Sequence, residues 1–294
     1  MPSVTADEFE THRAYLTAVA FRMLGNRAEA EDAVQEAWLR CAQQDDIRDP
    51  RGWLTTVTGR ICLDQLNSAR VRRTSYPGEW LPAFAVDPDA DPALYAERAD
   101  QVSVALLVVL ERLSPEQRVA FVLHDAFGLP FEEVAAVLDT TPATARQHAS
   151  RGRRAAADGQ IRHNAGLAEQ RRVLQAFLLA AQSGDMRMLA AVLAPDVVSI
   201  SDGGGVARSA LRPVLGWEKV GRLFHGILTR RAHEVSDLKV DPVLVEGGAA
   251  MMLRGRWPDG SPLLSVITVA VQDGRITGVF TQQNPAKLRL DDLL

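Results

Sequence analysis

Basic and amide side chains that can contact DNA bases are concentrated in a short stretch near the middle of the chain. Thr141 and Pro142 are typical of a helix N-terminus, because threonine caps free backbone N–H groups and proline suits the first turn. Ala145, Ala149 and Gly152 follow at helical spacing and predict a closely packed inward side. The outward side is predicted to hold only polar and basic residues: Arg146, Gln147, Ser150, Arg151, Arg153 and Arg154. Arginine and glutamine form paired hydrogen bonds to base edges, so this side is suited to a major groove.

Two further helices are predicted just before this stretch. Ser114, Pro115 and Gln117 form a capping-box signature, and Gly128 marks the end of the helix that follows. A second helix begins near Phe131. The predicted buried positions are Val119, Val122, Leu123 and Ala126 in the first helix and Val134, Ala135, Val137 and Leu138 in the second. Short helices joined by a turn, the last with a basic outer face, favour a helix-turn-helix over an ordinary helical hairpin with a solvated arginine-rich face.

Length and composition limit the class of protein. A chain of 294 residues predicts two or three domains, and 47% hydrophobic with 24% charged residues is ordinary for a globular protein. No apolar run approaches the roughly 20 residues that span a bilayer, and no leader peptide is evident. Cys41 and Cys62 fall at apolar helical positions and are expected to be buried thiols. We therefore expect a cytoplasmic protein without a membrane span, a metal site or a cofactor.

The formal net charge of −4 hides an uneven distribution of charge. A basic cluster lies at residues 60–73, where four arginines accompany the single acid Asp64. Residues 79–100 are acidic, and the arginine-rich stretch described above follows them. Two basic patches separated by an acidic connector predict a protein that contacts DNA at two places.

The N-terminal part is predicted to contain three helices. The first covers residues 8–24, the second residues 27–41, and the third begins at Asp49 and Pro50. The second helix has a regular apolar stripe and an opposite face that holds Glu31, Asp32, Gln35, Glu36 and Leu39. The basic end of the third helix is a candidate phosphate-binding surface. Trp53 and Tyr76 are aromatic residues that could meet unstacked bases, although core packing is the more common role for Trp53.

Two sequence blocks resemble a known family. The helix AEDAVQEAWLR (30–40), followed by DPRGWL (49–54) and a basic helix end, resembles region 2 of bacterial sigma factors. The helix-turn-helix at 114–154 resembles their region 4. The order and spacing of both blocks, which cover about the first 155 residues, resemble the extracytoplasmic-function group. The resemblance implies a transcription initiation factor rather than an enzyme, with RNA polymerase core and promoter DNA as partners.

The resemblance also implies roles for individual residues. The polar face of the second helix would bind the clamp helices of the largest polymerase subunit, and the flap is a further expected contact. The predicted polymerase-binding residues are Asp32, Gln35, Glu36 and Leu39, with Trp38 at the edge. The minus-ten element would be melted by the 46–53 loop and by Arg60, Asn67, Arg70, Arg72 and Arg73. The minus-thirty-five element would be read by Thr144, Arg146, Gln147, Ser150, Arg151 and Arg154. Ala145 and Ala149 replace the larger residues usual in the family, so the recognition helix is expected to lie closer to its partner.

The segments predicted are a region-2 domain (1–75), an acidic linker (76–103), a region-4 domain (104–160) and a C-terminal domain (164–294). The linker contains Trp80-Leu81-Pro82, whose apolar pair we expect to dock on a neighbouring domain. The C-terminal domain shows two helices, a third helix at 217–228, and strands at 197–201, 235–245, 249–257, 263–272 and 276–282. The predicted fold class is two all-α domains followed by an α+β cone, in which a curved antiparallel sheet encloses a pocket.

The C-terminal domain resembles the SnoaL-like domain of the nuclear-transport-factor-2 (NTF2) fold, through FLLAAQSGD (177–185), LAPDVV (193–198) and DGGG (202–205). The linker motif resembles a sigma-factor subgroup that carries this domain and has D-G-G-G-K and N-P-D-K-L signatures. Val206 and Ala286 replace the lysine of the first signature and the aspartate of the second, so we expect any latch between them to be weaker or apolar. Regulatory roles are implied for Trp80, Leu81, Pro82, Asp202, Gly203, Gly204, Gly205, Asn284, Pro285, Lys287 and Leu288.

In that subgroup, contact with this domain supports activity, while the extreme C-terminus restrains it. The glycines of the DGGG motif have an equally good simple explanation, since they could serve only to allow a positive φ in a turn. Two other functions compete with the sigma-factor hypothesis. One is a SnoaL-like enzyme with Asp196, Asp202 and His225 as acid–base candidates. The other is a dimeric one-component regulator that binds a small molecule in the C-terminal pocket. The sequence leaves open whether this domain binds a ligand or dimerises.

Overall fold

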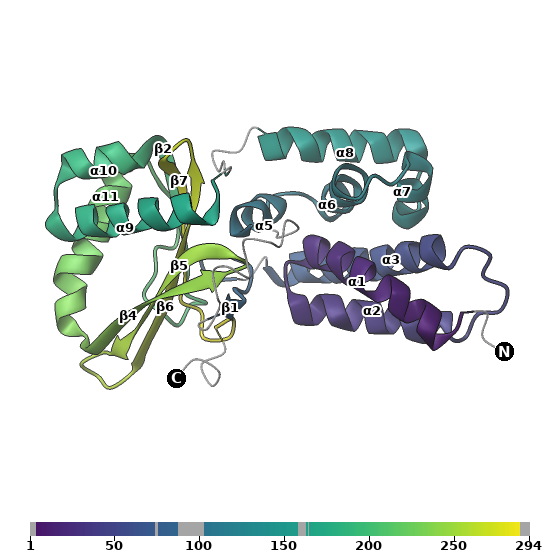
Figure 1. Ribbon diagram of the computed structural model, residues 1–294, viewed down its shortest axis with the longest axis horizontal. Helices are drawn as coiled ribbons and strands as arrows, with labels where there is room; N and C mark the ends of the chain where they lie inside the picture. Colours follow the sequence, from purple (N-terminus) through teal and green to yellow (C-terminus); the bar gives the residue numbers. More distant parts are fainter. Residues whose placement is uncertain (1–3, 74–75, 88–102, 158–162, 164, 289–294) are drawn as a thin grey trace. The chain divides into compact units, whose positions relative to one another are not determined.

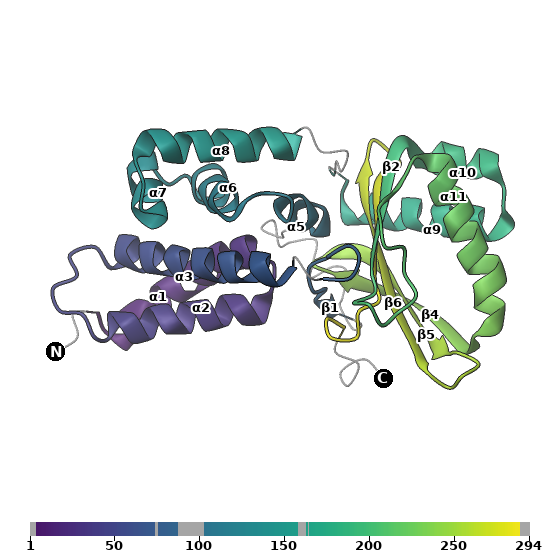
Figure 2. The same ribbon diagram turned by 180° about the vertical axis from the view of Figure 1, so that it is seen from behind.

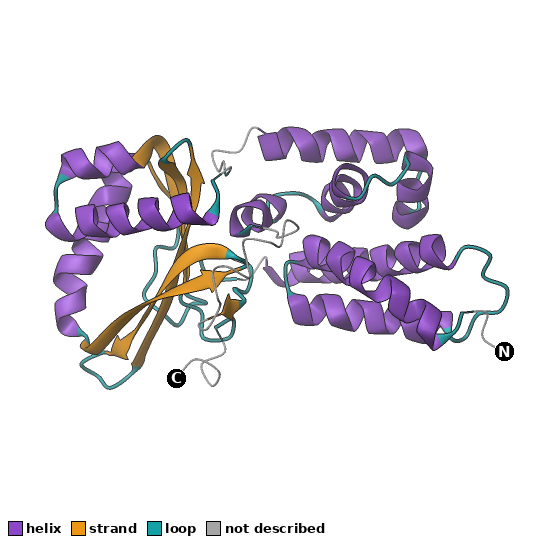
Figure 3. Ribbon diagram, viewed as in Figure 1, coloured by secondary structure: helices purple, strands orange, loops and turns teal. Residues whose placement is uncertain are grey.

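The computed structural model describes residues 4–73, 76–87, 103–157, 163 and 165–288 (Figures 1 and 3). The chain forms two compact units. The first contains Met1–Ser75 and Val109–Asp158, and the second contains Tyr76–Val108 and Gly159–Leu294. The beginning of the predicted linker therefore belongs to the same unit as the C-terminal domain, whereas its acidic part at 88–102 lies outside the described residues.

The first unit begins with three helices that pack against one another, α1 (Ala6–Leu24), α2 (Arg27–Cys41) and α3 (Pro50–Arg73) (Figure 2). Asn26 caps α2, its side chain accepting hydrogen bonds from the N–H groups of Ala28 (2.9 Å) and Glu29 (3.3 Å). The sequence places apolar residues on one side of each helix, and these form the core of the bundle. Both thiols are buried, and burial raises the pKa of Cys62 to about 12.

The helix-turn-helix part of the first unit follows α5 (Val104–Leu110) and comprises α6 (Pro115–Phe121), a π-turn (Val122–Ala126), α7 (Phe131–Leu138) and α8 (Pro142–Ala157). The predicted capping box is present, with Ser114 Oγ accepting from Gln117 N and Gln117 Oε1 accepting from Ser114 N, both at 3.3 Å. Ala126 is exposed, so its predicted buried position is wrong. The π-turn has more residues per turn than an α-helix and therefore rotates Ala126 out of the buried stripe.

The bundle and the helix-turn-helix part also pack on each other within the first unit. A Cβ atom added to Gly59 of α3 would lie 2.8 Å from a methyl group of Val137 in α7. Arg60 donates hydrogen bonds from Nη2 (2.7 Å) and Nε (3.3 Å) to the carbonyl oxygen of Ala136. A glycine at position 59 is thus required by the close approach of α3 and α7.

The second unit contains one seven-stranded sheet in the order β1-β4-β5-β6-β7-β2-β3. Its strands are β1 (Val86–Asp87), β2 (Leu193–Asp202), β3 (Val214–Leu215), β4 (Ser236–Val245), β5 (Gly248–Arg256), β6 (Pro262–Gln272) and β7 (Arg275–Gln282). The predicted antiparallel sheet is wrong in one respect, because β2 runs parallel to β7. Alternation of apolar and polar residues identifies a strand and its faces but contains no information on the direction of its neighbour.

Helices cover one face of this sheet and complete the predicted α+β fold, which is confirmed (Figure 1). They are α9 (Leu167–Ser183), α10 (Met186–Val192) and α11 (Trp217–Gly226), which is followed by a π-turn (Ile227–Arg231) and a 3₁₀ turn (Ala232–Glu234). The core joins Phe177 of α9 and Phe224 of α11, whose ring centroids are 5.0 Å apart, to sheet residues such as Val279. No helix in the described part of the chain is long and apolar enough to cross a lipid bilayer.

Candidate nucleic-acid interface and linker-docking site

The basic face of α8 is formed as the sequence predicts. Thr141 caps the helix, its Oγ1 accepting from the N–H of Thr144 at 3.2 Å. On the outward side, a shallow surface depression is lined by Ala143 and by five of the predicted base-contacting residues: Arg146, Gln147, Ser150, Arg151 and Arg154. All five are exposed, whereas Thr144 is half-buried beside the cap. The exposed donors of this face can therefore meet the acceptors of a DNA groove.

The inward side of α8 explains why the helix carries small residues. Ala145 and Ala149 have no exposed surface. A Cβ atom added to Gly152 would lie 3.0 Å from the carbonyl oxygen of Gln117 and 3.1 Å from Cβ of Phe121. Helix α8 therefore lies very close to α6, which holds the basic face in a fixed orientation.

Two arginines of α8 already have partners within the unit. Arg153 forms an ion pair with Asp125, with its Nη2 2.6 Å from Oδ1. Arg153 is exposed on the outward side, as predicted, but this ion pair engages part of its charge. The guanidinium of Arg146 lies over the ring of Phe131, 4.8 Å from its centroid, which positions the group but leaves it exposed.

The predicted minus-ten residues lie along α3 and differ in their exposure and in their hydrogen-bond partners. Asn67 and Arg70 are exposed. Arg60 is bound to the carbonyl oxygen of Ala136, as described above, and so faces α7 in this arrangement. Arg72 and Arg73 are in the last turn of α3, but their side chains lie outside the described part of the structure.

The predicted polymerase-binding residues share one exposed face of α2. Asp32, Gln35 and Glu36 are exposed, and Leu39 has 57% of its surface exposed. Trp38 is half-buried and stacks on Phe9, with ring centroids 4.7 Å apart. An exposed leucine among acidic and amide groups is suited to a protein partner, because the leucine offers apolar area and the polar groups offer specificity.

In the second unit, the start of the linker is bound by the C-terminal domain. We call this region the linker-docking site; its linker side consists of Tyr76, Trp80, Leu81 and Pro82, and its domain side of Asp202, Gln282, Asn284 and Lys287. Leu81 has no exposed surface, and β1 extends the docked segment by pairing with β4. The apolar pair Trp80-Leu81 therefore docks as expected.

Asp202 is the centre of the linker-docking site and has no exposed surface. Its carboxylate accepts hydrogen bonds from the hydroxyl of Tyr76 (2.5 Å) and the N–H of Leu81 (2.9 Å), and it pairs with Lys287 Nζ at 2.5 Å. Two of these three partners come from the linker. A buried carboxylate with a cation and several donors is well satisfied, so its loss is expected to be costly.

Lys287 binds the linker as well as Asp202. Its Nζ donates to the carbonyl oxygen of Leu81 at 2.6 Å and lies 3.1 Å from the ring centroid of Trp80. The expected weaker or apolar latch concerned positions 206 and 286, and the Asp202–Lys287 ion pair is a different contact. Val206, which replaces the lysine of the D-G-G-G-K signature, is 78% exposed, and a buried ion pair forms without it.

The amide side chains of β7 and the residues after it complete the linker-docking site. Gln282 donates to the carbonyl oxygen of Pro82 at 3.0 Å, and Asn284 donates to the hydroxyl of Tyr76 at 2.8 Å. Sequence reasoning did not identify Gln282, and it considered Tyr76 as a partner for DNA bases. No local signal could have found either role, because the partners are more than 100 residues apart in the chain.

Two glycines of the DGGG motif are required by close approach as well as by backbone conformation. Gly204 and Gly205 have φ values of +63° and +75°. A Cβ atom at Gly204 would lie 2.5 Å from the side chain of Asn284, and one at Gly205 would lie 2.6 Å from Pro77. The motif therefore allows the linker and the C-terminal segment to come together over β2.

The candidate acid–base residues do not form an active site. Asp202 is bound in the linker-docking site, and Nδ1 of His225 is 2.9 Å from the carbonyl oxygen of Ala181. Neither residue lines the cavity of the domain, and Asp196 does not line it either.

A three-helix bundle followed by a helix-turn-helix with a basic outer face defines a two-domain transcription initiation factor of the sigma type. Sigma-70 region 2 matches residues 9–72, and Sigma-70 region 4 matches residues 103–155. The chain belongs to the extracytoplasmic-function (ECF) RNA polymerase sigma factors, and it carries an additional C-terminal NTF2-like domain. It is thus a factor that directs transcription initiation, and not an enzyme.

Similar proteins share the whole arrangement of domains. The ECF RNA polymerase sigma factor SigJ of Mycobacterium tuberculosis is 41% identical over 296 residues, which cover 95% of this chain and 92% of SigJ. The probable ECF RNA polymerase sigma factor SigI of the same species is 36% identical over 284 residues, covering 95% and 93% of the two chains. The crystal structure of SigJ superimposes with a TM-score of 0.73 and 37% identity, over 97% of this chain and 98% of that one.

Proposed function

We propose that this sigma factor contacts a promoter at two places while α2 binds the polymerase core in the cytoplasm. The exposed donors of α8 read the upstream element, and the loop at 46–53 together with α3 binds the minus-ten element. The face of α2 around Leu39 docks on the clamp helices of the largest subunit. The exposure of these three surfaces supports the assignment.

Arg60 has an additional role in this proposal. Its Nε and Nη2 donate to the carbonyl oxygen of Ala136, so these two groups must leave that oxygen before they can bind a phosphate or a base. Binding of DNA by the whole guanidinium therefore competes with its hydrogen bonds to α7. We propose that these hydrogen bonds to Ala136 break when the factor binds a promoter.

We further propose that the C-terminal domain modulates the activity of the sigma factor in cis, through the linker-docking site. The observation that carries this proposal is the buried carboxylate of Asp202, which binds both the linker and Lys287. Tyr76 follows the last residue of α3, Arg73, by only three positions. Docking of the linker therefore restricts the movement of the chain segment that leaves the region-2 helices. Release of the linker removes this restriction.

The direction of the effect is the one implied by the resemblance to the sigma-factor subgroup, in which the extreme C-terminus restrains activity. Residues 284–288 hold the linker, so they restrain the factor, while the body of the domain supports it. We expect both Lys287→Met and removal of residues 284–294 to raise transcription several-fold, and removal of residues 164–294 to lower it.

The experiment is multiple-round transcription with polymerase core, at a promoter located by transcript mapping after overproduction of the factor. Lys219→Met is the matched control, because Lys219 is exposed on α11 and does not belong to the linker-docking site. Core binding is measured in parallel, so that a change in transcription can be separated from a loss of assembly. Equal transcription by the wild type and Lys287→Met would refute modulation through this site, and a decrease would refute the restraining role.

A further inference from the structure

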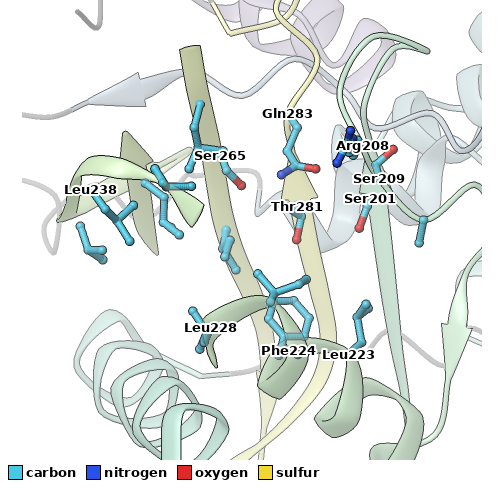
Figure 4. A pocket seen from close by; sticks show the side chains of 18 of the residues that line it. Ser201, Arg208, Ser209, Leu223, Phe224, Leu228, Leu238, Ser265, Thr281 and Gln283 are labelled. Carbon is cyan, nitrogen blue, oxygen red and sulfur yellow. The ribbon is translucent and has the colours of Figure 1, made fainter. Parts of the chain in front are cut away.

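The second unit contains a cavity of about 540 Å³ between the sheet and the α11 segment (Figure 4). This volume is typical of small-molecule sites. Most of the lining is apolar and comes from α11, the turn after it and strands β4, β5 and β6: Leu223, Phe224, Ile227, Leu228, Leu238 and Leu253 are representative. The cavity does not include the residues that hold the linker.

Polar groups gather at one end of the cavity. Figure 4 shows Ser201, Arg208 and Ser209 close together, with Thr281 and Gln283 beside them, whereas Leu228, Leu238 and the polar Ser265 lie apart from this group. Thr281 is only 7% exposed, and its Oγ1 has no hydrogen-bond partner in the described part of the chain. Buried hydroxyl groups normally find a partner, so this hydroxyl offers a hydrogen-bonding position to a ligand or a water molecule in the cavity.

The charges at the cavity indicate the sign of the ligand head. Arg208 is exposed, and its charge contributes to lowering the pKa of Asp259, which lies outside the lining. Arg222, the other basic residue of the lining, is already paired with Glu218 at 2.9 Å. No acidic side chain lines the cavity. The polar end therefore presents hydroxyl and amide groups together with one available cation.

We propose that this cavity binds an apolar molecule that carries a single carboxylate. The apolar body occupies the space beside Phe224 and Leu238, and the carboxylate accepts hydrogen bonds from Thr281 and from Arg208 at the opening. The proposal concerns a binding site, and it does not depend on the activity of the factor in transcription.

The same two strands connect the cavity to the linker-docking site. On β2, Ser201 lines the cavity and the next residue, Asp202, binds the linker. On β7, Thr281 lines the cavity and Gln282 binds the linker. Ser201 is paired with Thr281 and Asp202 with Gln282 in the parallel register. Because successive side chains of a strand point to opposite faces, a ligand and the linker contact opposite sides of one strand pair.

This arrangement makes the ligand a regulator of linker docking, a step that rests on the proposed function of the docking site. A ligand that orders Ser201 and Thr281 also affects the neighbouring residues that hold Tyr76 and Pro82. Thermodynamic linkage requires the effect to be reciprocal, so that release of the linker changes the affinity for the ligand by the same factor.

The binding test uses isothermal titration calorimetry on the full chain, with decanoate and 1-decanol as probes. We expect decanoate to bind with one-to-one stoichiometry and more tightly than the alcohol. Arg208→Gln should weaken decanoate about tenfold, the effect of one charge-assisted hydrogen bond, and should leave 1-decanol unchanged. Arg212→Gln is the control, since Arg212 is exposed and lies outside the lining. Leu238→Trp should abolish binding of both probes by filling the cavity, whereas Leu215→Trp on β3 should not.

Two results would overturn the binding site: absence of decanoate binding up to about 1 mM, a very weak affinity on the usual scale, or binding that Leu238→Trp leaves intact. Equal affinity for acid and alcohol would overturn the carboxylate assignment. The regulatory step is tested by the decanoate affinity of Lys287→Met, which should differ from that of the wild type. An unchanged affinity would overturn the coupling while the binding site stands, and neither result depends on a transcription assay.

Discussion

Individual arginines of α8 differ in what surrounds them, and this difference predicts different effects on DNA binding. Arg146 is held over Phe131 near the start of the helix, where recognition helices contact base edges. Arg154 lies two turns further along. We expect Arg146→Ala to cost about 1–3 kcal/mol at the preferred upstream element and little at other sequences. Arg154→Ala should weaken binding to all sequences evenly and lower the slope of the salt dependence by about one.

Titration of labelled duplexes at several salt concentrations measures both effects. Arg153→Ala is the control, because Arg153 is paired with Asp125 and should contribute less than Arg154. If Arg146→Ala weakened all duplexes to the same degree, its assignment to base recognition would be wrong.

Asp202 and Lys287 form a buried ion pair, so we expect their effects on the free energy of unfolding to depend strongly on each other. The side chains are 0% and 9% exposed, so removing one charge leaves the other buried without its partner. We expect Lys287→Met to lower the free energy of unfolding of the second unit by about 3 kcal/mol. The double variant Asp202→Asn with Lys287→Met should lose less than the sum of the two single variants.

Urea unfolding of the four proteins gives the coupling energy directly. Additive losses would show that the two side chains do not depend on each other, in contradiction to the short contact between them.

At the scale of elements, the exposed face of α2 is the proposed polymerase surface. The double change Gln35→Ala with Glu36→Ala should weaken binding to the polymerase core at least tenfold, since two polar contacts at an interface are lost. The fold should be retained, because both residues are exposed and Glu36 has only a surface ion pair with Arg40 at 3.0 Å.

Binding to fluorescently labelled core measures this effect, with Glu10→Ala on α1 as a control for the loss of an exposed acid. An unchanged affinity at unchanged circular dichroism would remove this face of α2 from the interface.

The elements differ in how far their sequence predicts them. Capping residues and helical spacing predicted α6, α7 and α8 closely, because these signals act within a few residues. The same reasoning failed at Ala126, where the π-turn is set by packing between helices. The parallel pairing of β2 with β7 and the Asp202–Lys287 pair were also not predictable, since they join residues far apart in the chain. Motifs located the linker-docking site, but only the structure shows which atoms form it.

At the scale of the whole molecule, the second unit should respond to pH through His163. The imidazole is half-buried, its Nδ1 accepts from the N–H of Val271 at 3.1 Å, and burial lowers its pKa below the ordinary value. Protonation would both charge the ring and remove the acceptor. The unfolded chain therefore binds the proton more readily than the folded unit. Neutral His163 makes its full contribution to the free energy of unfolding above about pH 6.5, and this contribution decreases as the pH falls below that value.

Thermal unfolding between pH 7.5 and 5.5 follows this effect, with His233→Gln, an exposed histidine, as the control. We expect His163→Gln to flatten the decrease in stability below pH 6.5. An identical slope in the variant and the wild type would assign the pH dependence to other groups.

We assign different functions to the two units. The first presents the surfaces that we propose for DNA and polymerase, and the second binds the start of the linker through Asp202 and Lys287. Because the linker connects region 2 to region 4, we propose that the domain that holds it influences promoter recognition without contacting DNA.

The most direct measurement of the central claim is run-off transcription with purified polymerase core on mapped promoter templates. We expect a transcript with a single start only when this chain is added, and a strong decrease when either the upstream or the minus-ten element is scrambled. The absence of a specific transcript from every promoter, or initiation indifferent to both elements, would contradict it.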